Sequence, residues 1–149
     1  ETEVTSELRT PDLLQNEGSV LFDRKEESRI ESARPRNKTI LKLIHSINNW
    51  NINLSNTRFG EVIWRHSTDP ANDQSFSAKI ITDLEIGRQL GEMLNLSIGA
   101  NNLLDIYPDE INVKNDPVTN LAGRFRYPWD VNQFGFNGRF YYFKMGLRL

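Results

Sequence analysis

Cysteine is absent from the 149-residue chain, which excludes disulfides, thiolate zinc sites and thiol nucleophiles. Long apolar runs are absent as well: the longest, residues 140–143, falls far short of the ~20 residues of a membrane-spanning helix. A strand of a transmembrane barrel needs only about ten residues of alternating polarity, so this absence does not exclude a barrel. Positive charge is not in excess, since 18 lysines and arginines face 20 aspartates and glutamates. We therefore expect no nucleic acid among the partners.

Motifs for catalysis, cofactor binding and metal binding are missing too. The chain has no glycine-rich phosphate loop and no Gly-x-Ser-x-Gly elbow. His45 and His66 have no partner at metal-ligand spacing, and residues 69–73 (DPAND) lack the glycine and glutamate of a calcium loop. Asp83 and Glu85 share one face of a predicted strand, where solvation explains paired carboxylates better than acid–base catalysis does. We therefore expect no enzyme activity, no catalytic residues, no metal and no cofactor.

The first 36 residues differ from the rest of the chain. Charges of both signs alternate from residue 23 to residue 38, a pattern typical of a solvated loop with one short helical stretch that ends before Pro35. The chain starts at Glu1 without the basic and apolar regions of a signal peptide. We therefore expect residues 1–36 to form a charged loop, or an incomplete preceding strand, of a longer protein.

From residue 37 onward the hydrophobic period is two, which predicts β-strands. Turn residues at 48–49 and 87–91 predict two antiparallel hairpins, whereas residues 65–75 and 105–134 form long connections. Short turns on one side and long loops on the other are typical of outer-membrane barrels. The predicted fold is an all-β antiparallel up-and-down meander with strands at about 39–48, 50–65, 75–88, 93–105 and 136–149.

Alternation within these strands separates an apolar face from a polar face. In a barrel wall the apolar face meets lipid and the polar face meets the lumen. Trp50 and Tyr141 fall on the apolar face, where we expect them to join an aromatic girdle. The residues predicted to face lipid are Ile80, Leu84, Ile86, Leu96, Ile98, Phe143, Met145 and Leu147, and those predicted to face the lumen are Lys79, Asp83, Glu85, Asn95, Asn101, Lys144 and Arg148.

The connection at residues 105–134 is the richest in aromatic and arginine side chains. Such side chains can stack on planar parts of a ligand and pair with its anionic groups. Their alternative role is to pack the loop or to join the aromatic girdle. The candidate ligand-binding residues are Arg124, Arg126, Tyr127 and Trp129.

Five segments of the chain resemble one family. Residues 95–108 (NLSIGANNLLDIYP) are similar to the penultimate strand of TonB-dependent outer-membrane receptors, where Asn-Asn-Leu-Phe-Asp leads into the last long extracellular loop. Residues 34–38 (RPRNK), 57–61 (TRFGE) and 79–84 (KIITDL) resemble other strand ends of the family in the same order. Residues 139–149 resemble its terminal strand, although Leu149 stands where the family usually has phenylalanine or tryptophan.

The resemblance implies that residues 37–149 are the last five or so strands of a 22-stranded transmembrane β-barrel. Residues 1–36 and 105–134 would then lie in extracellular loops. The implied function is TonB-dependent uptake of a scarce solute, such as an iron–siderophore complex, across the outer membrane of a Gram-negative bacterium. The implied partners are outer-membrane lipid, the rest of the barrel, a plug domain, the solute, and TonB through a missing N-terminal region.

Two other functions fit the pattern of strands. One is an outer-membrane barrel that serves assembly or adhesion, with the long loops as partner surfaces. The other is an extracellular β-sandwich binding module, which would need bulky apolar residues on the inward faces of two packed sheets. The polar second face of the strands argues against the sandwich. No residue pattern selects the solute among siderophores, haem, cobalamin and glycans.

Overall fold

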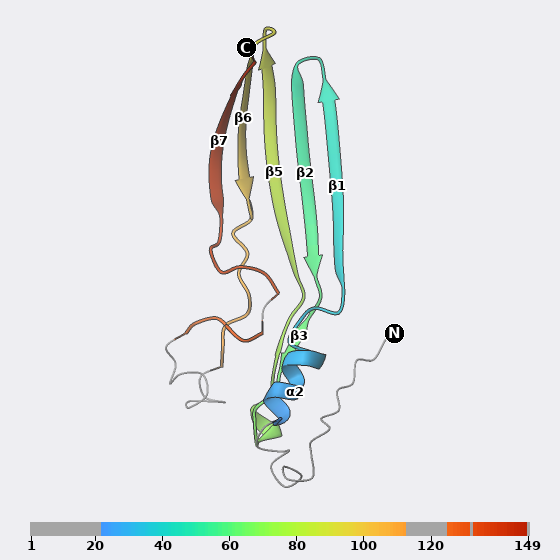
Figure 1. Cartoon of the computed structure of the whole chain (residues 1–149), viewed down its shortest axis with the longest axis vertical. Helices are drawn as coiled ribbons and strands as arrows, with labels where there is room; N and C mark the ends of the chain where they lie inside the picture. Colours follow the sequence, from blue (N-terminus) through green and yellow to red (C-terminus); the bar gives the residue numbers. More distant parts are fainter. Residues whose placement is uncertain (1–21, 113–124, 132, 149) are drawn as a thin grey trace. The chain divides into compact units, whose positions relative to one another are not determined.

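Antiparallel strands are the main secondary structure of the computed structural model, which describes residues 22–112, 125–131 and 133–148 (Figure 1). One sheet has five strands in the order β1-β2-β5-β6-β7, and a second pairs β3 with β4. The protein is therefore all-β, with one described α-helix and one 3₁₀ helix. The elements are α2 (Arg24–Glu31), β1 (Lys38–Ile47), β2 (Trp50–Phe59), β3 (Val62–Trp64), η2 (Pro70–Asn72), β4 (Gln74–Phe76), β5 (Lys79–Leu90), β6 (Leu94–Asn101) and β7 (Phe140–Leu147).

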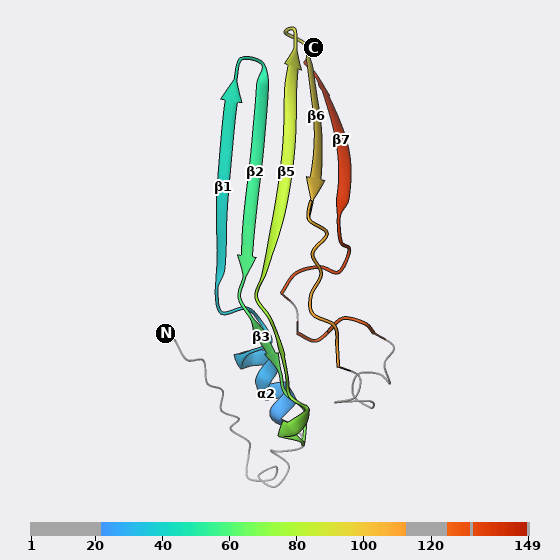
Figure 2. The ribbon, with the colours of Figure 1, turned by 180° about the vertical axis from the view of Figure 1, so that it is seen from behind.

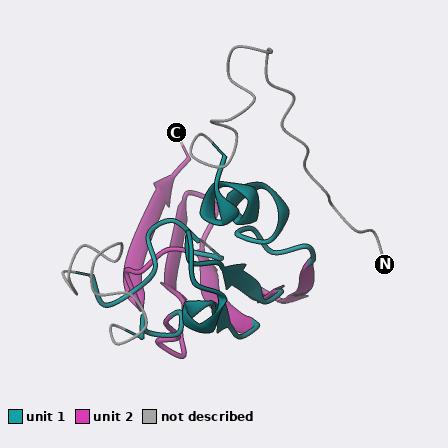
Figure 3. Ribbon diagram, turned by 90° about the horizontal axis from the view of Figure 1, so that it is seen from below, with its two compact units in different colours: residues 1–37, 60–78, 108–134 teal, residues 38–59, 79–107, 135–149 magenta. Residues whose placement is uncertain are grey.

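The chain divides into two compact units, each built from three segments (Figure 3). The sheet unit comprises residues 38–59, 79–107 and 135–149, and it contains the five-stranded sheet. The loop unit comprises residues 1–37, 60–78 and 108–134, and it contains α2, β3, η2 and β4. The loop unit is therefore assembled from the N-terminal segment and both long connections.

The five-stranded sheet is a single layer whose tight turns lie at one end. Figures 1 and 2 show the β1–β2 and β5–β6 turns at the same end of the strands, together with the end of β7. The N–H of Arg148 donates to the carbonyl of Met93 over 2.8 Å, which ties the end of β7 to the β5–β6 turn. We call these the turn end and, opposite to it, the loop end of the sheet.

The predicted meander is confirmed, but several predicted strand limits are wrong. The second hairpin turns over residues 91–93, where Gly91 has a φ of +64°, so Gly91 alone of the predicted turn residues 87–91 lies in the turn. Gly87 lies inside β5 instead, paired with Asn51 and Ser97. The strand predicted at 93–105 ends at Asn101, and the one predicted at 136–149 begins at Phe140 and is described as far as Leu147. Leu149 lies outside the described residues.

The strand predicted at residues 50–65 is two strands, and the strand predicted to begin at 75 begins at Lys79. Gly60 marks the break after β2: its N–H donates to the carbonyl of Asn37 over 2.9 Å, and a Cβ there would lie only 2.9 Å from Asn37 Oδ1. The buried amide of Gln133 donates to the carbonyls of Gly60 (2.6 Å) and Ser77 (3.0 Å). The side chain of Gln133 therefore binds both sites at which the predicted long strands are interrupted. The period-two pattern of the sequence does not reveal these interruptions.

A buried apolar cluster and a capped helix organise the loop unit. The cluster consists of Ala33, Val62, Trp64, Phe76 and Val131. The short helix predicted in the charged segment is present as α2, whose N-cap Asp23 accepts from the N–H of Glu26 over 2.9 Å. None of the helices in the described part of the chain has the length and apolar character needed to cross a membrane.

Candidate functional site

The apolar face of the five-stranded sheet extends over all five strands, although it also carries His45 and Arg58. Strand register aligns Leu54 and Leu84 in one cross-strand row, which β1 and β7 extend with Leu43 and Tyr141. Side chains on this face are largely exposed, as shown by Leu43 at 61% and Phe143 at 62%. All eight residues predicted to face lipid occupy this face by register: Ile80, Leu84, Ile86, Leu96, Ile98, Phe143, Met145 and Leu147.

Two polar residues on the apolar face satisfy each other. The hydroxyl of Thr82 on β5 donates to the side-chain carbonyl of Asn56 on β2 over 2.7 Å. The two residues are paired in register, and Thr82 is only 8% exposed. Because hydrogen bonding offsets the free-energy cost of taking polar groups out of water, this pair is compatible with an apolar surrounding.

Aromatic side chains stacked with arginine lie toward both ends of the apolar face. Near the turn end, Arg88 Cζ lies 4.9 Å from the ring centroid of Trp50. Near the loop end, Arg139 Cζ lies 5.3 Å from the ring centroid of Tyr141. Amphipathic aromatics and arginines are the side chains that bridge apolar and aqueous surroundings.

The opposite face of the sheet is mainly polar, although Ile40, Ile44, Ile81 and Phe140 also lie on it. Register places on it six of the residues predicted to face a lumen: Lys79, Asp83, Glu85, Asn95, Asn101 and Lys144. The seventh, Arg148, follows the last residue of β7. Amide and hydroxyl side chains of Asn51, Asn53, Ser55, Gln89 and Ser97 extend the same face. The surface is therefore mainly neutral and hydrogen-bonding, with a few charges.

A three-residue network crosses three strands on the polar face. Tyr142 on β7 donates its hydroxyl proton to Glu85 Oε2 on β5 over 2.8 Å, and Lys144 forms an ion pair with the same oxygen. The tyrosine reaches across Gly99 on β6, where an added Cβ would overlap the phenol ring. Glycine at this position therefore lets the tyrosine lie flat on the sheet and join β5 to β7.

The Asn-Asn-Leu-Leu-Asp segment that follows β6 fixes the loop end of the sheet. Asn102 has a φ of +51°, and its amide both donates to the carbonyl of Ile106 (2.7 Å) and accepts from its N–H (2.9 Å). Its own N–H donates to Asp83 Oδ1 over 2.8 Å. Asp105 Oδ1 accepts from the N–H of Arg139 over 2.8 Å, just before β7. The segment thus positions the last strand against β5 and β6.

The predicted ligand cluster is only partly assembled by contacts in the loop unit. Arg124 lies outside the described residues. Arg126 pairs with Glu110, its Nε lying 2.7 Å from the carboxylate, and its guanidinium carbon lies 5.5 Å from the ring centroid of Tyr127. Both members of the Arg126–Glu110 pair are well exposed, so a ligand anion could replace the carboxylate at little free-energy cost.

Trp129 lies beside cations of α2, an arrangement that the sequence did not reveal. Lys25 Nζ and Arg29 Cζ lie 5.9 Å and 5.8 Å from the centroid of its ring. Lys25 also pairs with Asp130 (3.3 Å), which accepts from the indole N–H of Trp64 (2.9 Å). The tryptophan is still 45% exposed, so part of its surface is available to a ligand.

An ion pair holds the loop between β3 and β4 to α2. Arg24 donates two hydrogen bonds to the carboxylate of Asp73, at 2.8 and 3.3 Å, and the N–H of His66 donates a third over 2.9 Å. Burial alone would raise the pKa of Asp73, but these hydrogen bonds outweigh it and hold the pKa below its ordinary value. The hydrogen bond to Asp73 raises the pKa of Arg24 in turn.

Acid should therefore loosen this loop. Because the folded-state pKa of Asp73 lies below the unfolded one, the stabilisation is present above about pH 4 and is lost as the pH falls through the folded value. A nitroxide at residue 67, in a Ser67→Cys variant, should gain mobility in that range. Asp73→Asn should make the label mobile at neutral pH, and Glu61→Gln, at an exposed position, should change nothing. If the mobility of the label at residue 67 does not change with pH, Asp73 does not hold this loop through its ionised carboxylate.

No family model, curated protein or solved structure matches the chain. In residues 22–112, 125–131 and 133–148, no three side chains of histidine, cysteine, aspartate or glutamate gather as a metal site requires. The five-stranded sheet presents two different surfaces to its surroundings, one mainly apolar and one mainly polar.

Proposed function

We propose that the five-stranded sheet is part of the wall of a transmembrane β-barrel, in which the apolar face meets lipid and the polar face meets the lumen. The observation that carries this proposal is the predominance of apolar side chains on one face and of polar side chains on the other, which is clearest on β6 and its neighbour β7. A soluble sandwich would cover an apolar face with a second sheet, whereas side chains such as Phe143 and Leu147 are 62% and 66% exposed. Lipid is a surrounding in which such a face is stable.

Strand length supports the same proposal. The five strands have 10, 10, 12, 8 and 8 residues, against the usual 5–6 in globular proteins. A tilted strand needs about 9–11 residues to cross the hydrocarbon layer. The sheet also has two open edges, at β1 and β7, and a closed barrel supplies partners to both.

The finer part of the proposal rests on the resemblance of the short segments. We propose that the barrel has 22 strands and belongs to a TonB-dependent transporter in the outer membrane of a Gram-negative bacterium. The solute would be an iron–siderophore complex or a similar scarce compound. Its candidate contacts in this chain are Arg126, Tyr127 and Trp129.

Site-directed spin labelling tests the barrel wall directly, because the chain has no native cysteine to remove. Single Leu84→Cys and Asp83→Cys variants would carry a nitroxide in outer-membrane vesicles. We expect the label at 84 to be relaxed by lipid-soluble oxygen and the label at 83 by a water-soluble nickel chelate. Positions 98 and 97 should repeat the contrast on β6.

Two results would contradict the proposal. Equal access of the nickel chelate to residues 83 and 84 would indicate a sheet surrounded by water. Oxygen access at 83 with nickel access at 84 would mean that the faces are reversed, since a shift of one residue reverses every side chain.

A further inference from the structure

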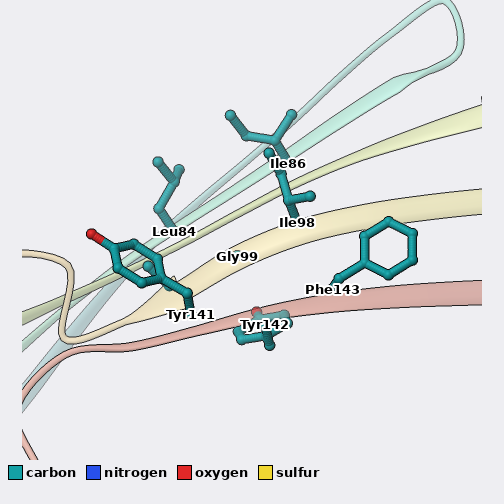
Figure 4. Close-up of a pocket in the computed structure, with 8 residues that line it drawn as sticks. Leu84, Ile86, Ile98, Gly99, Tyr141, Tyr142 and Phe143 are labelled. Atoms are coloured by element: carbon teal, nitrogen blue, oxygen red, sulfur yellow. The ribbon is translucent and has the colours of Figure 1, made fainter.

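The apolar face is hollowed near the loop end of β6. Ala100 forms the floor, because its small side chain lies in a row between Leu84 and Tyr141 and is only 4% exposed. Figure 4 shows Leu84, Ile86 and Ile98 standing on one side of this hollow and Tyr141 and Phe143 on the other. The hollow has a volume of about 480 Å³ and lies open along the sheet surface. An extended hydrocarbon chain fits a shallow apolar trough of this kind.

An arginine whose guanidinium forms no ion pair within the described residues stands next to this hollow, and its backbone N–H donates to Asp105. Arg139 precedes β7, and its guanidinium carbon lies 5.3 Å from the ring of Tyr141, which lines the hollow. Its side chain donates to the carbonyl of Leu103 over 3.3 Å, and within the described residues it forms no ion pair. The residue is exposed. Guanidinium donors in this setting suit a phosphate, which they can bind through two parallel hydrogen bonds.

We propose that the hollow binds one acyl chain of an anionic membrane lipid whose headgroup phosphate lies against Arg139. This inference rests on the proposed barrel wall, which places the apolar face in lipid. The charge selects the lipid: an uncharged or zwitterionic headgroup gains less from the exposed guanidinium of Arg139 than an anionic headgroup does. The groups along the surface match those of an amphiphile: apolar side chains surround Ala100, the ring of Tyr141 comes next, and the guanidinium of Arg139 follows.

Electron spin resonance on the reconstituted protein tests this assignment. The probes are nitroxide-labelled phosphatidylglycerol and phosphatidylcholine, each in trace amount in phosphatidylcholine vesicles. We expect the motionally restricted fraction to be larger for phosphatidylglycerol. Arg139→Gln should lower this preference about fivefold, the equivalent of about 1 kcal/mol for one basic residue at a membrane surface. Arg148→Gln, which removes an arginine at the turn end, should leave the preference unchanged.

Filling the hollow supplies a second variant. Ala100→Leu should lower the restricted fraction of both lipids, because the added side chain occupies the trough. It should not change the ratio between the lipids, since Arg139 is still present. Excess inorganic phosphate should not abolish the preference for phosphatidylglycerol. That result would show that the intact lipid is bound, and not the phosphate group alone.

Three results would overturn the inference. The first is an unchanged preference for phosphatidylglycerol in Arg139→Gln, and the second is an unchanged restricted fraction in Ala100→Leu. The third is dipolar broadening of a nitroxide at Ile98→Cys, which would indicate a second copy of the chain over the hollow. The labels at residues 83 and 84 separate this failure from that of the proposed function. If residue 84 is in lipid but no preference is found, only the inference fails.

Discussion

Replacing Gly99 by alanine should destabilise the five-stranded sheet by about 1–2 kcal/mol, because a hydrogen bond to a charged group is lost while alanine is a better strand residue than glycine. The added Cβ would lie 2.8 Å from Cε2 of Tyr142 and still closer to the end of the phenol ring. The ring would have to lift from the sheet, so its hydrogen bond to Glu85 would be lost. The loss of a bond to a charged group therefore outweighs the gain from replacing a glycine inside a strand.

Gly146→Ala provides the matched control for this prediction. Gly146 is on the same polar face, and a Cβ there would meet Asn95 at an ordinary 3.9 Å. The measurement is the free energy of unfolding in guanidinium of protein reconstituted in vesicles. Tyr142→Phe removes the hydroxyl alone and should reproduce the loss of the hydrogen bond to Glu85. Equal stability of the two alanine variants would show that Tyr142 does not cross Gly99.

Replacing Trp129 by alanine should weaken solute uptake about thirtyfold, because a buried aromatic contact at a binding site commonly contributes ~2 kcal/mol. The expectation rests on the proposed transport function and on the exposed part of the ring beside Lys25 and Arg29. Uptake of ⁵⁵Fe supplied as a ferric siderophore measures it. Arg126→Ala should act in the same direction, since its exposed pair with Glu110 is readily exchanged for a ligand anion.

The control is Phe125→Ala, because Phe125 is as exposed as Trp129, at 45% each. Its loss should leave uptake near the wild-type level. Each variant must reach the membrane in normal amount, which immunoblotting of membrane fractions establishes. Unchanged uptake in both the Trp129 and Arg126 variants would remove this loop from the binding site.

The strands and their faces followed from the sequence because period two is a local property. The alternation from Ile80 to Ile86 separates the faces of β5, and the pairing with β6 then repeats the division. The limits of the strands were less accurate where distant residues decide them. Gly60 and Ser77 end their strands by bonding to Gln133, and no pattern near either residue encodes that partner.

The candidate ligand site shows the same limit. Proximity in sequence suggested one cluster from residue 124 to residue 129, yet Trp129 takes its cations from α2, about a hundred residues earlier in the chain. The Asn-Asn-Leu-Leu-Asp segment was recognised only as a resemblance. The folded structure shows its physical role: Asn102 makes a left-handed turn, and Asp105 accepts a hydrogen bond from the N–H of Arg139.

The Gln133 bridge also bears on the order in which the molecule forms. A turn at residues 48–49 closes a hairpin locally, whereas the bonds from Gln133 to Gly60 and Ser77 close loops of 73 and 56 residues. Since the entropy lost on loop closure grows with each doubling of length, at about 0.6 kcal/mol, these are among the costliest contacts to nucleate. Loop closure therefore favours an order in which the contact that ends two strands is made after those strands have paired.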